Sequence, residues 1–72
     1  MRGPKGMKLL LVNGVEHHSE AASLAAVLAE LKLDDAMVAT ALNGEFVPAG
    51  QRAVTQLAAG DKIEILAPMQ GG

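Results

Sequence analysis

The sequence contains no cysteine. A thiol is needed for a disulfide, a persulfide, a thiolate ligand to a metal and a cysteine nucleophile. These four kinds of chemistry are therefore excluded for the side chains of this chain. Any reaction with sulfur in which the chain takes part must use another atom.

Aromatic residues and clusters of positive charge are also scarce. Phe46 is the only Phe, Tyr or Trp, and the formal net charge is -2 at pH 7. Nucleic-acid binding relies on basic clusters and on aromatic side chains that stack on bases, so we expect no nucleic-acid partner. No apolar run reaches the roughly 18 residues of a membrane span, and no signal-peptide pattern is present. We therefore predict a cytoplasmic protein without a membrane contact.

The first half of the chain predicts a β-hairpin. Residues 8–12 form a continuous apolar run, typical of a strand that is covered on both faces or central in a sheet. Asn13-Gly14 follows, and Asn-Gly between extended segments is a strong signal for a tight turn, because both turn residues must accept a positive φ. Residues 15–18 then return as a polar edge strand.

His17 and His18 are candidate metal ligands or catalytic groups. Adjacent strand residues point to opposite faces of a sheet, so the two rings cannot easily bind one ion together. The sequence around them offers no cluster of carboxylates or thiols that would complete a site. We therefore interpret both as ordinary exposed strand residues and predict no metal site.

A helix is predicted next. Ser23 is a plausible N-cap, and Ser19 is its competitor. The helix spans about ten residues, because the apolar residues recur at i, i+3, i+4 and i+7 and so form one stripe. These residues are Leu24, Val27, Leu28 and Leu31. The pattern ends at Asp34-Asp35, two carboxylates that we expect to be solvated in a loop.

The second half predicts three more strands. Residues 37–42 form a strand, Asn43-Gly44 a second tight turn, and residues 45–47 a short strand that Pro48 ends. Residues 51–59 are irregular or form a helical turn, with Val54 and Leu57 pointing inward. Gly60-Asp61 then turns the chain into the last strand. In that strand Ile63 and Ile65 alternate with three residues of the opposite face, which are Lys62, Glu64 and Leu66.

These elements predict an α+β fold of a single domain. A chain of 72 residues is long enough for one small domain, which buries only about 60% of its unfolded surface. If the first and last strands pair in parallel at the centre, the fold is a ubiquitin-like β-grasp, with a mixed sheet of four to five strands packed on one helix. We expect residues 1–6 to be a disordered leader or tag, residues 7–67 to form the domain, and residues 68–72 to be a flexible C-terminal tail.

The last residues of the sequence are Gln70, Gly71 and Gly72. Glycine contributes no packing and costs backbone entropy, so a terminal Gly-Gly does not serve stability. It is either a frayed end or a functional tail, and the dipeptide alone leaves both alternatives open. Its place directly after the last strand favours a tail that can reach into the active site of another protein.

The sequence resembles the ThiS family of sulfur carriers of thiamin biosynthesis. The resemblance extends from Met7 to Gly72, and it depends mainly on two segments. The first is Ala-Leu-Asn-Gly-Glu-Phe-Val-Pro at residues 41–48. The second is Gly-Asp-Lys-Ile-Glu-Ile-Leu-Ala-Pro-Met-Gln-Gly-Gly at residues 60–72. In one departure, Ala26 occupies a position where the family often has a glutamate, so a capping box is absent.

The resemblance implies that the Gly72 carboxylate is the working group. In that family a ThiF-type enzyme uses ATP to adenylate the terminal carboxylate, and a persulfide donor then converts it to a thiocarboxylate. The thiocarboxylate supplies sulfur to the thiazole synthase ThiG. The sequence itself has no phosphate-binding loop, no thiol and no convincing acid–base pair. We therefore expect a carrier without a bound cofactor, and not an enzyme.

Three alternatives remain at this point. A MoaD-like small subunit of molybdopterin synthase would share the fold, the ending and the activation chemistry, but not the acceptor. A ubiquitin-like modifier would attach through Gly72 to lysines. A plain interaction module with this fold would not need the free Gly-Gly terminus.

The docking surface for the partners is a separate hypothesis. Exposed apolar side chains beside a reactive tail suit a transient partner. We predict that Leu66, Met69 and Phe46 form an apolar patch that packs on the activating enzyme. The alternative is that Phe46 and Leu66 belong to the core.

Overall fold

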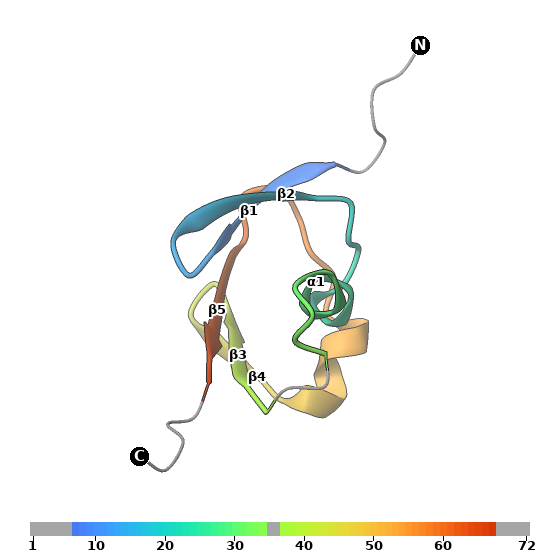
Figure 1. The fold of residues 1–72 in the computed structure, drawn as a ribbon, viewed down its shortest axis with the longest axis vertical. Coiled ribbons are helices and arrows are strands. Elements are labelled where there is room, and N and C mark those ends of the chain that lie inside the picture. Colours follow the sequence, from blue (N-terminus) through green and yellow to red (C-terminus); the bar gives the residue numbers. More distant parts are fainter. Residues whose placement is uncertain (1–6, 35–36, 68–72) are drawn as a thin grey trace.

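A computed structural model describes residues 7–34 and 37–67 of the chain. The predicted leader, Asp35 and the predicted tail lie outside these residues. The described elements follow one another along the chain as two strands, a helix, two strands, a short 3₁₀ helix and a last strand (Figure 1). They are β1 (Lys8–Val12), β2 (Val15–Ser19), α1 (Leu24–Glu30), β3 (Ala39–Leu42), β4 (Glu45–Val47), η1 (Ala49–Val54) and β5 (Lys62–Leu66).

The strands form one mixed sheet in the order β2-β1-β5-β3-β4. The first and last strands pair in parallel, and β5 pairs with β3 in the antiparallel direction on its other side. Helix α1 lies against one face of the curved sheet (Figure 1). The predicted β-grasp fold is confirmed, with five strands and with β5 at the centre of the sheet.

Both Asn-Gly turns form as predicted. Asn13 and Gly14 have φ values of 52° and 82°, and Asn43 and Gly44 have φ values of 51° and 87°. Two successive residues with positive φ give the type I′ turn, whose twist matches that of the strands it connects. The turns join β1 to β2 and β3 to β4.

Helix α1 begins where the sequence predicts and ends earlier. Ser23 is the N-cap, and its hydroxyl accepts a hydrogen bond from the amide of Ala26 at 3.1 Å. The helix has seven residues and its C-cap is Leu31, so the expected length of about ten was wrong. Lys32 follows with φ 62°, and the amide of Leu33 donates to the carbonyl oxygen of Leu28. This pattern is a Schellman motif, which usually has glycine at the position of Lys32.

Ser19, the competitor for the N-cap, has a different role. Its side chain is buried and accepts a hydrogen bond from the amide of Ala21 at 2.8 Å. It also donates to Glu30 Oε1 at 2.7 Å, so it links the end of β2 to the end of α1. Lys8 Nζ donates to the carbonyl oxygen of Ala21 at 2.9 Å. Hydrogen bonds to β1 and to the helix therefore stabilise the connection between β2 and α1.

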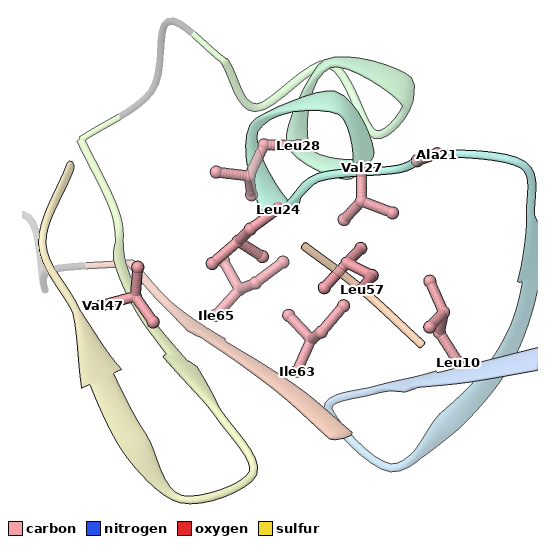
Figure 2. Packing of buried hydrophobic residues seen from close by; sticks show 9 residues of the cluster. All are labelled: Leu10, Ala21, Leu24, Val27, Leu28, Val47, Leu57, Ile63 and Ile65. Atoms are coloured by element: carbon pink, nitrogen blue, oxygen red, sulfur yellow. The ribbon is translucent and has the colours of Figure 1, made fainter. Parts of the chain in front are cut away.

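The core lies between α1 and the sheet and is entirely aliphatic (Figure 2). Helix residues Leu24, Val27 and Leu28 are buried against Ile63 and Ile65 of β5. The remaining buried members come from other parts of the chain; they are Leu10, Ala21, Val47 and Leu57. The alternation of β5 predicted from the sequence is confirmed, because its two isoleucines face the helix.

Two predictions for the second half of the chain were wrong. Val54 was expected to point inward, but it ends η1 and is 70% exposed, whereas Leu57 is buried as predicted. The third strand was expected to begin at Met37, but β3 begins at Ala39, and Met37 is 82% exposed. The register explains the difference, because Ala39 pairs with Leu66, the last residue of β5. Residues before Ala39 therefore have no rung of β5 to pair with.

Candidate docking face and carboxyl terminus

The face of the sheet opposite α1 is the candidate docking face. We call it the outer face. Side chains alternate along a strand, so β5 directs Ile63 and Ile65 toward the helix and the other three residues to the outer face. The register places residues of the neighbouring strands beside these three on the same face. The residues that the register places side by side on the outer face include Leu11 of β1, Lys62, Glu64 and Leu66 of β5, Ala39 and Ala41 of β3, and Phe46 of β4.

Leu66 and Phe46 project from this face into solvent. Each is 69% exposed. The alternative that they belong to the core was therefore wrong. Their role as docking residues stays a prediction.

Leu66 and Phe46 are not adjacent. Phe46 pairs with Ala41 across β3 and β4, and Leu66 pairs with Ala39 across β3 and β5. They lie two strand spacings apart across the sheet and two residues apart along the strands, which together correspond to about 12 Å. The small side chains of Ala39 and Ala41 on β3 therefore lie between the two large side chains.

Leu66 shares an open hollow with Leu11 of β1. The hollow has a volume of about 540 Å³ and lies between β5 and the turn at Asn13. Lys62 and Glu64 also line it, so its lining contains one charged residue of each sign. The arrangement is suited to accept an apolar side chain of a partner with polar groups around it.

Sequence analysis missed Leu11 as a candidate docking residue. The continuous apolar run of β1 was interpreted as a strand covered on both faces or central in the sheet. The central position is confirmed, because β1 pairs with both β2 and β5. Only Leu10 of this strand is fully buried, however, and Leu11 is half-buried on the outer face. The signal was available, since one predicted helix can cover only one face of a sheet.

The predicted docking residue Met69, the two tail residues and the predicted sulfur-carrying residue Gly72 all belong to the C-terminal segment. Met69, Gln70, Gly71 and Gly72 lie outside the described residues. The chain leaves the sheet at Leu66, and a chain spans at most about 3.5 Å per residue. The six residues from 67 to 72 can therefore reach at most about 20 Å beyond β5.

The side chain of Asn13 holds the backbone of β5 close to its end. The amide of Ile65 donates to Asn13 Oδ1 at 2.8 Å, and Asn13 Nδ2 donates to the carbonyl oxygen of Ile65 at 3.1 Å. One carboxamide thus satisfies both backbone groups of a single residue. Sequence analysis assigned Asn13 to the turn alone and missed this contact.

The two histidines point to opposite faces, as predicted. His17 pairs with the buried Leu10, and its Nε2 lies 3.2 Å from Glu30 Oε1. His18 pairs with Leu9 and is exposed on the outer face. Among the described residues no group of three or more His, Cys, Asp or Glu side chains gathers as it would for a metal ion. The interpretation that neither ring is a ligand or a catalytic group stays a prediction.

Residues 7–34 and 37–67 contain no helix that is long and apolar enough to cross a membrane.

Comparisons with known proteins identify the family. A search of curated proteins gives no significant match. Among solved structures, the crystal structure of a thiamine biosynthesis protein (ThiS) from Geobacter metallireducens is similar, with 32% sequence identity and a TM-score of 0.74. The alignment covers 89% of this chain and 99% of that chain. The model of the ThiS family matches residues 10–72, which include the terminal Gly-Gly. The chain therefore belongs to the ThiS family.

Proposed function

We propose that this protein is a sulfur carrier for thiamin biosynthesis, and that its Gly72 carboxylate is converted to a thiocarboxylate. The observation that carries the proposal is the match to the ThiS family, which runs through to Gly72. The similarity to a thiamine biosynthesis protein of nearly the same length supports it. In this proposal the acceptor of the sulfur is the thiazole precursor of thiamin, and not the molybdopterin precursor of the MoaD-like alternative.

The chemistry explains why the terminus needs an activating enzyme. A carboxylate is stabilised by resonance and is a poor electrophile. In the proposed first step a Gly72 carboxylate oxygen attacks the α-phosphorus of ATP, and pyrophosphate leaves. The terminal sulfur of a persulfide donor then attacks the carbonyl carbon, and AMP leaves. A thiol reductant cleaves the resulting sulfur–sulfur bond, and the thiocarboxylate remains on Gly72.

The glycines are suited to this substrate role. A side chain at Gly71 or Gly72 would obstruct a narrow channel to the nucleotide, and glycine also allows φ and ψ values that other residues avoid. Without a cysteine, the side chains of the chain offer no other acceptor for the sulfur. The chain thus acts as the substrate of a ThiF-type adenylating enzyme, which binds the ATP, and then as the sulfur donor to the thiazole synthase ThiG.

The outer face is the proposed surface for these partners. Leu66 and Phe46 are exposed on it, and Leu66 is the last residue of β5 before the C-terminal segment. A partner that covers this face is therefore close to the terminus that it must receive. We extend the predicted docking set of Leu66, Met69 and Phe46 by Leu11, because Leu11 and Leu66 line the same hollow.

The test is the intact mass of the protein after incubation with ATP, a ThiF-type enzyme and a persulfide source. We expect the mass to increase by the difference between a sulfur and an oxygen atom. The control is a variant that lacks Gly72, for which no increase is expected. An unchanged mass of the full chain, with an enzyme that modifies another ThiS protein in parallel, would overturn the proposal.

The acceptor is tested separately. The thiocarboxylate form is incubated with ThiG and the thiazole precursors, and in parallel with a large molybdopterin synthase subunit and its precursor. We expect sulfur transfer only in the first reaction. Transfer only in the second would assign the chain to the MoaD-like function.

A further inference from the structure

The hydrogen bonds between β1 and β5 continue beyond the point where β1 turns away. The amide of Leu11 donates to the carbonyl oxygen of Asp61 at 3.0 Å, and the amide of Asn13 donates to that of Ile63 at 2.8 Å. The backbone then reverses at Asn13-Gly14. The next partner of β5 on this side is the Asn13 carboxamide, which bonds both the amide and the carbonyl oxygen of Ile65.

A carboxamide has the same donor and acceptor as a peptide group. The Asn13 side chain therefore substitutes for one further residue of β1 and extends the ladder by one rung. On the other side of β5, β3 pairs with Ile65 through Thr40 and with Leu66 through Ala39. With the Asn13 carboxamide, β5 is held on both sides up to Ile65.

The other Asn-Gly turn provides a comparison. Asn43 has nearly the same φ as Asn13, and its Oδ1 accepts a hydrogen bond from the amide of Lys62 at 3.0 Å. Its Nδ2 donates to Asp61 Oδ1 at 3.0 Å. Asn43 therefore holds the beginning of β5, whereas Asn13 holds the end that leads to Gly72.

We propose that Asn13 is a positioning residue for the C-terminal segment. Its carboxamide fixes the backbone of Ile65 and thereby the direction in which the chain leaves the end of β5, which favours productive presentation of the Gly72 carboxylate to the activating enzyme. The inference rests on the proposed function. It assigns to Asn13 a role in the catalytic step rather than in docking.

The physical reason is the ordering cost of binding. A segment that must adopt one direction in the complex binds and reacts better when that direction is already fixed in the free protein. Asn13 also lines the hollow that Leu11 and Leu66 share, but its replacement keeps these two apolar side chains, so we expect docking to be largely preserved. The terminus then reaches the nucleotide in fewer of the bound complexes, and kcat falls while KM changes little.

The test compares Asn13→Gly with Asn43→Gly. Glycine removes the carboxamide and accepts the positive φ of both turns, so the two variants differ mainly in which end of β5 is released. Amide hydrogen exchange is measured in the free proteins, and their stability is measured by urea unfolding. The rate of pyrophosphate release is measured with a ThiF-type enzyme over a range of carrier concentrations.

We expect similar stabilities for the two variants. Exchange at Ile65 should be about tenfold or more faster in Asn13→Gly than in Asn43→Gly, because two hydrogen bonds are lost there. We expect kcat to fall about tenfold in Asn13→Gly alone, with KM within about twofold of the wild type, since misplacement affects the chemical step. If Asn13→Gly does not fold, Asn13→Asp is used as the second test variant. It keeps the acceptor for the Ile65 amide but turns an oxygen toward the Ile65 carbonyl, and it should also lower kcat.

Other results would overturn the inference. Equal kcat values for the two glycine variants would show that Asn13 does not position the terminus. A rise in KM without a fall in kcat would make Asn13 a docking contact instead. A wild-type chain that releases no pyrophosphate would overturn the proposed function as well, so the two failures are distinguishable.

Discussion

Truncation of Leu66 to alanine should weaken binding to the activating enzyme much more than it weakens the fold. Full burial of a leucine side chain stabilises by about 1.5–3 kcal/mol. Leu66 is 69% exposed in the free protein, so about a third of this contribution serves the fold. We expect Leu66→Ala to lower the free energy of unfolding by about 0.5–1 kcal/mol, measured by urea unfolding.

The remaining two thirds of the side chain are available to a partner. If the enzyme buries this surface, Leu66→Ala should cost about 1–2 kcal/mol of binding free energy. This corresponds to a KM for the carrier that is about 5- to 30-fold higher. The kcat should stay close to that of the wild type, because the interaction is the same in the bound ground state and in the transition state. The measurement is pyrophosphate release as a function of carrier concentration.

Val54→Ala is the matched control. Val54 is 70% exposed, but η1 lies next to α1, on the side of the sheet that the helix covers (Figure 1). Its truncation should therefore leave the KM unchanged. If Leu66→Ala and Val54→Ala gave the same KM as the wild type, Leu66 would not belong to the docking surface. A similar rise for both variants would show a nonspecific effect of surface truncation and would equally refute the reasoning.

Two further predictions concern the ends of α1. Lys32→Gly should raise the free energy of unfolding by about 0.5–1 kcal/mol, because relief of the left-handed strain exceeds the added entropy of the unfolded chain. The urea midpoint should rise, whereas Lys32→Ala, which keeps the strain, should show no such gain. Ser23→Ala removes the bond to the amide of Ala26 and should lower the free energy of unfolding by about 1 kcal/mol. An unchanged urea midpoint for Ser23→Ala would contradict the assignment of Ser23 as the N-cap.

The parts of the fold predicted correctly depend on local signals. The Asn-Gly turns require positive φ, and the serine before the apolar stripe satisfies a free amide of the helix. The alternation of Ile63 and Ile65 with polar residues predicts which face of β5 packs against the helix, and this prediction needs no information about the other strands. Each of these signals involves residues that are close in sequence, so a short segment is enough to predict the feature.

The parts missed depend on contacts between distant residues or on an unusual residue at a common position. The end of α1 was placed too late because Lys32 takes the position at which glycine is the usual signal. Val54 is exposed although η1 contacts α1, and no local pattern in the sequence indicates which side of η1 faces the helix. The bond from Asn13 to Ile65 joins residues that are 52 positions apart, and no turn propensity reveals it.

The candidate site shows the same division. Leu66 and Phe46 were named from the sequence as candidate docking residues, and the register shows that they share the outer face. Leu11 was missed although the parallel pairing that brings it beside β5 was predicted, because the continuous apolar run of β1 does not itself show which face the helix leaves open. Gly72 was assigned from the family resemblance and remains a prediction that the mass measurement tests.

The topology relates the docking face to the terminus. A carrier must offer two partners the same carboxylate, and each partner must recognise the chain by contacts other than that carboxylate, which changes during the cycle. The central strand β5 is suited to both needs, because its outer residues form part of the proposed docking face and its end leads to the segment that contains Gly72. A change on the outer face should therefore alter KM with both partners, whereas a change at Asn13 should alter the catalytic step with both. If Asn13→Gly slowed adenylation but not sulfur transfer to the thiazole, the direction of the terminus would matter only for the first partner.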